Sequence, residues 1–279
     1  MYKILQKKVL NPTVVSITVE APHVARRAKA GQFIILRVDE EGERVPFTIA
    51  NADPEKGTVT VIYQIVGATT RKLAELNEGD ALADFAGPLG RPSEIEGENV
   101  VVIGGGVGCA IALPTAKAFH DAGKNVDTIV GFRNKDLVIL EDEFRSVSDH
   151  YYLMSDDGSV GEKGLVTAKL EELIKNGQTI DKVIAIGPLI MMKFVCQLTK
   201  KYDIPTVVSM NPIMIDGTGM RGGCRLMVDG KMKFACVDGP DFDGHLVDFD
   251  AAMSRNRQYG EKERHDYEET CNLLNKEAE

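Results

Sequence analysis

The sequence predicts an antiparallel β-barrel followed by a parallel α/β domain, with a small cysteine-containing loop region and a helical tail at the C-terminus. Three observations support this fold class. Short alternating apolar runs fill residues 1–97, strand and helix patterns alternate over 98–208, and a glycine-rich segment with two cysteines occupies 209–245. Residues 246–279 are rich in charge and show a helical pattern. We therefore expect four consecutive pieces.

The barrel is predicted from strands in which apolar and polar residues alternate, because one face of each strand packs on the core and the other meets water. Turn residues separate these strands, and one helical pattern interrupts them, at 69–76. The expected strands cover residues 1–9, 14–19, 32–38, 44–50 and 57–63.

The α/β domain is predicted from nearly continuous apolar runs, which are typical of parallel strands buried on both faces. The first run, 100–103, leads into a glycine cluster and a helix that extends to about Ala122. Further runs cover 126–130, 151–154, 183–186 and 206–208, with helical patterns between them.

Composition and charge exclude several classes of protein. The chain has 279 residues, a net charge of −9 and no basic run long enough to follow a phosphate backbone, so we expect no nucleic-acid binding. No window approaches the roughly 20 apolar residues that span a bilayer, and the N-terminus lacks a signal core. The five cysteines are odd in number and unevenly spaced, unlike a secreted disulfide framework. We expect a cytoplasmic protein that does not bind membranes.

Gly104, Gly105, Gly106 and Gly108 form a cluster between a strand and the following helix. Backbone N–H groups at such a junction can contact a pyrophosphate without obstruction by side chains. The cluster lacks the Gly-x-Gly-x-x-Gly spacing of the dinucleotide fingerprint. Taken alone, it is compatible with a nucleotide site or with a tight turn.

The strand Arg44–Thr48 carries a second candidate site. Its arginine and threonine are in phase, so they can reach a diphosphate and the ring of a bound cofactor from the same face. Pro46 is tolerated where a strand lies at a sheet edge. The alternative is an exposed edge strand with an unrelated arginine.

Three further segments, in a characteristic order, favour the binding interpretation. They are Gly67–Thr70 at a helix start, Gly87–Gly90 at the end of the barrel, and Ile186–Met192 after a long strand. Together with Arg44–Thr48 and the glycine cluster, they make the first 208 residues resemble the ferredoxin-NADP reductase family.

That resemblance implies an FAD-binding barrel followed by a nicotinamide-nucleotide domain. It also implies that Thr48 lies near the flavin ring as a hydrogen-bond partner, which makes it the candidate catalytic residue. The cofactor-binding residues that it implies are Arg44, Pro46, Phe47, Thr48, Gly67, Thr69, Thr70, Gly87, Gly104, Gly105, Gly106, Gly108, Gly187, Pro188 and Met191.

The segment from Asp216 to Cys224, followed by Cys236, has glycines spaced as in a loop that folds around an iron-sulfur cluster. It resembles the small subunit of NADH-dependent ferredoxin:NADP oxidoreductase, or sulfide dehydrogenase, and more distantly the dihydroorotate dehydrogenase electron-transfer subunit. The resemblance implies a [2Fe-2S] cluster held by one aspartate and three cysteines. Asp216, Cys224 and Cys236 match three of these ligands, and Arg221 occupies the remaining position.

Arg221 makes the cluster doubtful. A guanidinium stays protonated and has no lone pair for iron, and its charge repels the metal. We expect the cluster to be lost or unstable. The alternative is a cluster whose fourth ligand is exogenous or comes from a nearby side chain.

Asp156 and Asp157 follow a strand end where the resemblance places the adenosine end of the nucleotide. Their charges repel a 2′-phosphate and can accept a hydrogen bond from a ribose hydroxyl, so we expect NAD(H) in preference to NADP(H). Arg133 and Lys135 favour the opposite preference, or are solvated surface charges.

The function implied by the resemblance is that of an NAD(P)H-dependent flavin oxidoreductase subunit. Hydride passes between NAD(H) and FAD, and electrons pass to a larger iron-sulfur flavoprotein related to the small subunit of glutamate synthase. Two alternatives stay open. One is a cluster-deficient structural or regulatory subunit, and the other is the electron-transfer subunit of a dihydroorotate dehydrogenase-like complex.

Overall fold

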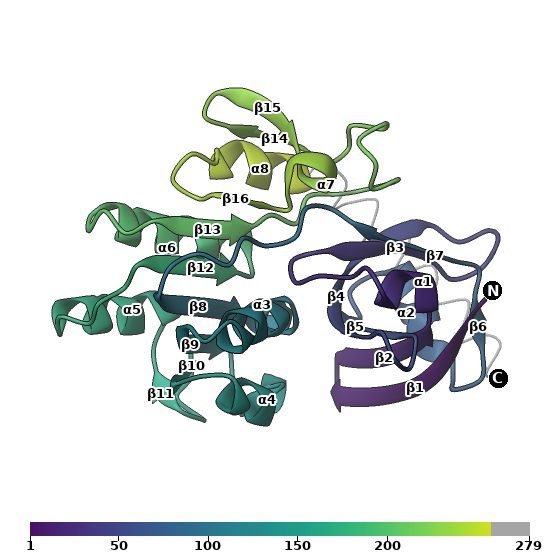
Figure 1. The fold of residues 1–279 in the computed structure, drawn as a ribbon, viewed down its shortest axis with the longest axis horizontal. Helices are drawn as coiled ribbons and strands as arrows, with labels where there is room; N and C mark the ends of the chain where they lie inside the picture. The colour runs from purple at the N-terminus through teal and green to yellow at the C-terminus, as the bar shows by residue number, and fades with distance from the viewer. Residues whose placement is uncertain (258–279) are drawn as a thin grey trace.

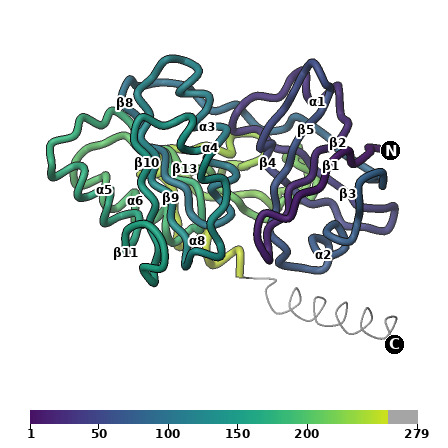
Figure 2. Tube along the Cα trace, turned by 90° about the horizontal axis from the view of Figure 1, so that it is seen from below, coloured from purple at the N-terminus to yellow at the C-terminus, as the bar shows by residue number. Residues whose placement is uncertain are grey.

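The computed structural model describes residues 1–257, which form two seven-stranded sheets and a small hairpin (Figure 1). One sheet is antiparallel and the other is mostly parallel. The two sheets lie side by side, with α3 (Cys109–Asp121) packed between the parallel sheet and the barrel strand β4 (Arg44–Asp53) (Figure 2). Among the described residues, no helix is long and apolar enough to cross a membrane.

The antiparallel sheet curls into a nearly closed barrel. Its strand order is β6-β1-β2-β5-β4-β3-β7, so the two edge strands are β6 and β7. Only Ala83 separates these two strands along the chain, which brings the edges of the sheet together. The barrel strands are β1 (Tyr2–Asn11), β2 (Val14–Glu20), β3 (Phe33–Arg37), β4, β5 (Thr58–Gln64), β6 (Ala81–Leu82) and β7 (Asp84–Leu89), with α1 (Pro22–Ala25) and α2 (Ala68–Glu75) in the connections.

Strand β4 changes partner half-way along its length. Residues 44–48 pair with β3, and the ladder with β5 begins only at Ile49. Pro46, which has no N–H to donate, therefore lies in a half-strand that is paired on one side. This change of partner leaves one edge of Arg44–Thr48 open, although β4 is an interior strand of the barrel.

The barrel core follows from the alternation of residues along the strands. In β5, Val59, Val61 and Tyr63 are buried while the residues between them are partly exposed. They pack with Ile17 and Leu36 from neighbouring strands in one apolar cluster. The period of two seen in the sequence is thus the inside–outside pattern of the barrel wall.

The parallel sheet has a topological switch point between β8 (Asn99–Gly105) and β12 (Lys182–Ile186). From β8 the chain runs outward through β9 (Asn125–Phe132) and β10 (His150–Ser155), and then returns to the other side of β8 as β12. Such a reversal opens a crevice at the carboxyl ends of the two central strands. The remaining elements are β11 (Glu162–Lys163), β13 (Thr206–Ser209), the 3-10 helices η1 (Gly106–Gly108) and η2 (Lys135–Leu137), and the helices α4 (Glu141–Ser146), α5 (Val166–Lys175) and α6 (Leu189–Lys200).

The cysteine-containing segment is joined to the parallel sheet. The hairpin of β14 (Arg225–Val228) and β15 (Lys231–Phe234) leads through α7 (Ala235–Asp238) to β16 (Asp241–Asp243), which pairs antiparallel with β13. Helix α8 (Phe249–Asn256) follows and packs against β14 and α6. The segment is therefore more than a loop, because it supplies an edge strand to the neighbouring sheet.

The predicted fold class is confirmed: a barrel precedes a parallel sheet with helices. Of the strands missed in the sequence, β6 and β11 have only two residues each, which is too short to show a periodic pattern. The domain boundaries stay predictions. The helical tail predicted for 246–279 is described only as far as 257, and residues 258–279 lie outside the described part of the chain.

We expect Phe119→Ala to lower the free energy of unfolding by about 3–5 kcal/mol, because it empties a site in the core between α3 and the parallel sheet. Phe119 is fully buried there. The measurement is equilibrium denaturation followed by circular dichroism. The control is Phe194→Ala on α6, where the ring is 51% exposed and the expected change is small. Equal losses in the two variants would contradict this assignment of the core.

Candidate functional site

A cleft of about 460 Å³ opens at the switch point of the parallel sheet. Its walls come from the loop after β8, the loop after β12 and the barrel turn between β1 and β2. The cleft therefore lies where the two sheets meet. The predicted residues that line it are Gly105, Gly106, Gly108, Asp156, Gly187, Pro188 and Met191.

Glycines hold the two central loops of this cleft in close contact. A Cβ built on Gly108 would lie 2.6 Å from the carbonyl oxygen of Ile186, and one built on Gly187 would lie 3.1 Å from Cα of Gly105. A Cβ on Gly105 would lie 2.5 Å from Sδ of Met191. Any larger residue at these positions would push the loops apart, so the glycines are required for packing and also leave the backbone accessible in the cleft.

The first loop presents its backbone to the cleft. Gly106 has φ of +55° and open space where a Cβ would stand, and η1 runs directly into α3. The N–H groups at the start of a helix lack intrahelical partners and attract anions. This arrangement fits the phosphates of a nucleotide.

Polar residues that sequence reasoning missed complete the cleft on the barrel side. Asn11 is the last residue of β1 and Thr13 lies in the turn that leads to β2, and Asn11 donates through Nδ2 to the carbonyl of Leu137, at 3.2 Å. That bond ties the barrel to the α/β domain. The Asn-Pro-Thr sequence predicts only a turn, so nothing local marked it as part of a site. The other missed residues with a polar side chain on the cleft wall are Gln64, Ser209 and Asn211.

The structure separates the two predicted specificity carboxylates. Asp156 lines the cleft, as does Arg133. Asp157 does not, because its carboxylate accepts from the backbone N–H of Ser159 at 2.9 Å. Hydrogen bonds from Ser159 also lower the pKa of Asp157, so it stays ionised within its own turn. Of the two predicted carboxylates, only that of Asp156 belongs to a residue of the cleft wall.

On the barrel, Arg44 lies next to the ion pair between Arg37 and Asp84. Asp84 on β7 pairs with Nε of Arg37 at 2.7 Å, and its contact with Nη2 of Arg44 is longer, at 3.5 Å. The side chain of Arg44 is 53% exposed. Because Arg37 already neutralises Asp84, the guanidinium of Arg44 is available for an anionic ligand.

The start of α2 lies near Arg44. Thr69 donates to the carboxylate of Glu43 at 3.1 Å, and Glu43 is the neighbour of Arg44 in sequence. Thr70 caps the helix, accepting from the N–H of Gly67 at 3.0 Å. A Cβ built on Gly67 would meet nothing within 4 Å, so open space lies in front of the helix start. Arg44, Gly67 and Thr69 thus fit a diphosphate, while Thr70 holds the helix start in shape.

The remaining predicted cofactor residues divide into two groups. Phe47 and Thr48 follow Pro46 in the part of β4 that is paired on one side, and both are half-buried. Within residues 1–257, Thr48 makes no side-chain hydrogen bond. Gly87 and Gly104 have packing reasons to be glycine, since a Cβ would lie 2.7 Å from Ile34 Cγ2 and 2.8 Å from Cys109 Sγ, respectively. Gly104 does not line the cleft.

Two buried thiols meet in the cysteine segment. The Sγ atoms of Cys224 and Cys236 are 3.0 Å apart, and both residues are almost fully buried. Burial, with the adjacent Cys224, raises the pKa of Cys236 to about 12. The loop before Cys224 turns through Gly217, Gly219 and Gly222, all with φ between +64° and +84°, a conformation that favours glycine.

The other two positions of the predicted ligand set do not complete a cluster site. Asp216 accepts from Oγ1 of Thr218 at 2.9 Å and from the N–H of Met220 at 3.1 Å, so its carboxylate serves the loop itself. Burial opposes ionisation of Asp216, but these local hydrogen bonds leave its pKa below the usual value. Arg221 is exposed. Over residues 1–257, no group of three potential ligands converges on one point, so the residues present do not fit a four-ligand [2Fe-2S] site.

Comparison with known proteins gives the family. Residues 211–248 match the family described as iron-sulfur cluster binding domain of dihydroorotate dehydrogenase B. The chain is 45% identical to the dihydroorotate dehydrogenase B (NAD(+)) electron transfer subunit homolog of Thermotoga maritima, over 95% of this chain and 94% of that protein. It belongs to the dihydroorotate dehydrogenase B electron-transfer subunit family.

Further relatives support the assignment of the chain to this family. The corresponding subunit of Streptococcus pneumoniae is 32% identical over 86% of this chain and 94% of that protein. A chain in the structure of the NADH-dependent reduced ferredoxin-NADP oxidoreductase, solved to study flavin-based electron bifurcation, is 44% identical. That match covers 96% of this chain and 97% of the other, with a TM-score of 0.91, and it confirms the resemblance inferred from the sequence. A ferredoxin NADP+ reductase from Neisseria gonorrhoeae, at 16% identity and a TM-score of 0.56, shares the fold.

We expect Arg221→Cys to raise the iron content of protein prepared anaerobically to about two irons per chain, with the visible absorption of a [2Fe-2S] centre. The change replaces a cation with a soft anionic ligand three positions before Cys224 in the same glycine-rich loop. The control is Arg225→Cys, an exposed position one residue past Cys224. Iron analysis that finds a full cluster in the unchanged chain would contradict the expectation.

Proposed function

We propose that this chain is a flavoprotein subunit that exchanges hydride between NAD(H) and FAD and passes electrons to a larger partner. The observation that carries the proposal is the cleft at the switch point, where backbone of the two glycine loops faces the barrel residues Asn11, Thr13 and Gln64. Membership of an electron-transfer subunit family supports it.

The chain's own residues bind and orient the two groups. Gly106 and the start of α3 offer N–H groups to the phosphates of the nicotinamide nucleotide. The guanidinium of Arg44 and the N–H groups at the start of α2 bind the flavin diphosphate. The loop from Gly187 to Met191 closes the far wall of the cleft. Transfer of hydride between a nicotinamide and a flavin is the chemistry that these groups supply when bound. No side chain is required as an acid or base, and the role of Thr48 is to offer its hydroxyl beside the flavin ring.

The partner that we propose is an iron-sulfur flavoprotein related to the small subunit of glutamate synthase. Three apolar side chains support a docking surface around the cysteine loop, namely Ile215, Met220 and Val237, which are 46%, 87% and 45% exposed. An apolar patch of this kind on a surface loop is typical of contact with another protein.

A second candidate function is favoured by Arg221. A subunit without a cluster retains nucleotide binding but serves a structural or regulatory role in the complex. Visible absorption of the purified complex distinguishes the two candidates when it is combined with reduction by NADH. Flavin bands that bleach on addition of NADH, with electrons then reaching the partner, support electron transfer. Protein without bound flavin supports the structural role.

We expect Arg44→Ala to weaken FAD binding roughly tenfold or more, because it removes a charge-assisted contact worth about 1.5–3 kcal/mol. The flavin retained after extensive dialysis is measured from its absorption. Arg26→Ala is the matched control, since Arg26 is exposed and its side chain donates to the carbonyl of Pro22, at 3.1 Å, with no other side-chain hydrogen bond or ion pair within residues 1–257. If both variants keep the flavin content of the unchanged chain, the barrel site is misassigned.

We expect Asp156→Asn to shift the ratio of NADH to NADPH activity toward NADPH by about tenfold, because one repulsive charge leaves the cleft. Asp157→Asn provides the control, since that carboxylate accepts from the N–H of Ser159 and the residue is not part of the cleft wall. The assay is steady-state reduction of an artificial acceptor with each nucleotide. Activity of the unchanged chain that is higher with NADPH would refute the proposed preference for NAD(H).

A further inference from the structure

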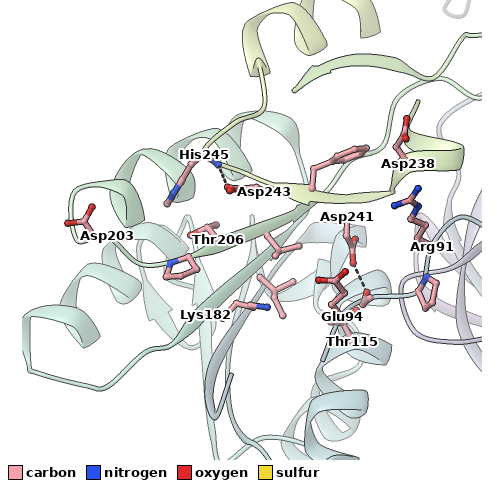
Figure 3. Close-up of a pocket in the computed structure, with 16 residues that line it drawn as sticks. Arg91, Glu94, Thr115, Lys182, Asp203, Thr206, Asp238, Asp241, Asp243 and His245 are labelled. Atoms are coloured by element: carbon pink, nitrogen blue, oxygen red, sulfur yellow. Dashed lines mark hydrogen bonds between the residues drawn. The ribbon is translucent and has the colours of Figure 1, made fainter. Parts of the chain in front are cut away.

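A second and larger cavity, of about 630 Å³, lies against the edge of the parallel sheet that carries β13 and β16 (Figure 3). It shares no lining residue with the nucleotide cleft. Its walls are the linker between barrel and sheet at residues 91–94, one residue of α3, and the turn that contains Asp203. The proposed hydride exchange uses none of these residues.

The middle of this cavity is apolar. Ile184 on β12 and Val207 on β13 are register partners on neighbouring strands and form its floor, while Phe242 on β16 is paired with Val208 and packs in the apolar cluster on the other face of the sheet. Polar residues lie at the two ends of the cavity, with Asp241, Glu94 and Thr115 toward one end and Asp203 and His245 toward the other (Figure 3). The cavity is thus suited to an extended molecule with an apolar chain and polar ends.

The charges of the lining are unbalanced. Five carboxylates face one lysine and one arginine, and both cations have partners of their own. Lys182 pairs with Glu96 at 3.3 Å, outside the lining, and Nε of Arg91 donates to the carbonyl of Val237 at 3.1 Å. The carboxylates are those of Glu94, Asp203, Asp238, Asp241 and Asp243. Within residues 1–257, neither Glu94 nor Asp203 makes a side-chain hydrogen bond or ion pair.

Two polar atoms in the lining are buried and have no partner among the described residues. They are Oγ1 of Thr115, in a residue that is 1% exposed, and Oδ1 of Asp241. The other oxygen of Asp241 accepts from Oγ of Ser93 at 2.5 Å. Burial raises the pKa of Asp241. The hydroxyl groups of Ser93 and Ser209 act to lower this pKa, and the charge of Glu94 raises it further. A buried carboxylate beside a second one is stabilised by a cation.

We propose that this cavity binds an organic ammonium group carried on an aliphatic chain. The ammonium donates to Asp241 and Thr115 beside Glu94, and the chain lies over Ile184 and Val207. The group belongs to a free diamine or to a lysine side chain of another protein, which share this chemistry. The inference goes beyond the proposed function, because it assigns a ligand to a different face of the sheet.

The lining favours an ammonium group over a metal ion. A divalent cation needs several oxygen ligands at one point, and over residues 1–257 no three potential ligands converge. An ammonium needs only a few acceptors, and its alkyl chain gains from the apolar floor. The five carboxylates are spread along the cavity instead of being gathered at one centre.

The test is isothermal titration calorimetry of the full chain at an ionic strength of about 0.15 M, where long-range attraction of cations to an acidic protein is screened. The titrants are 1,5-diaminopentane, Nα-acetyl-lysine amide, 1,5-pentanediol and Mg²⁺. The variants are Glu94→Gln and Asp241→Asn. The control is Glu171→Gln on α5, where the carboxylate pairs with Lys175.

We expect saturable binding of the diamine, none of the diol, affinity about tenfold or more weaker in both variants, and no change in the control. Binding of the lysine amide as well assigns the group to a partner protein, and binding of the diamine alone assigns it to a free amine. The proposal is overturned if neither amine binds, if Glu94→Gln binds as the control does, or if Mg²⁺ binds and the amines do not. Flavin content and NADH-dependent dye reduction, measured on the same samples, report separately on the proposed function.

Discussion

The arrangement of the molecule depends on close contact between two backbone loops at the switch point. Gly108 lies against the carbonyl of Ile186, and Gly187 lies against Gly105, at separations that leave no room for a Cβ. This contact sets the distance between β8 and β12 at their carboxyl ends, and the barrel turn at Asn11 then closes the third side. A cleft shaped by backbone varies little with side-chain motion, which suits two planar ligands that must be held face to face.

Elements with strong local patterns could be predicted from the sequence, and elements formed by tertiary pairing could not. The apolar run before Gly104 is β8, because four β-branched residues in a row fit a strand buried on both faces. The Asp-Phe-Asp of β16 has a composition that strands disfavour, and it is a strand because Ser209 and Val208 on β13 supply its partners. No analysis of local sequence detects that pairing.

The same division applies to the candidate site. The position of the glycine cluster between a strand and a helix indicated Gly105 and Gly106, and the family resemblance implied Gly187. Neither could show that Gly104 supports Cys109, or which of Asp156 and Asp157 faces the cleft. Those choices depend on turn geometry, in which neighbouring residues point in opposite directions. Asn11 was missed for another reason, because its role comes from contact with a residue 126 positions away.

The three-residue strand β16 also has a bearing on solubility. A parallel sheet exposes unpaired N–H and C=O groups along each edge, and such edges recruit strands from other molecules. Here one edge ends in the two-residue strand β11, too short to serve as a template, and the other is covered when β16 pairs with β13. The cysteine segment therefore acts as a shield for the sheet whether or not it holds iron. A chain that lost this segment would expose β13 to self-association and would also lose Asn211 from the wall of the cleft.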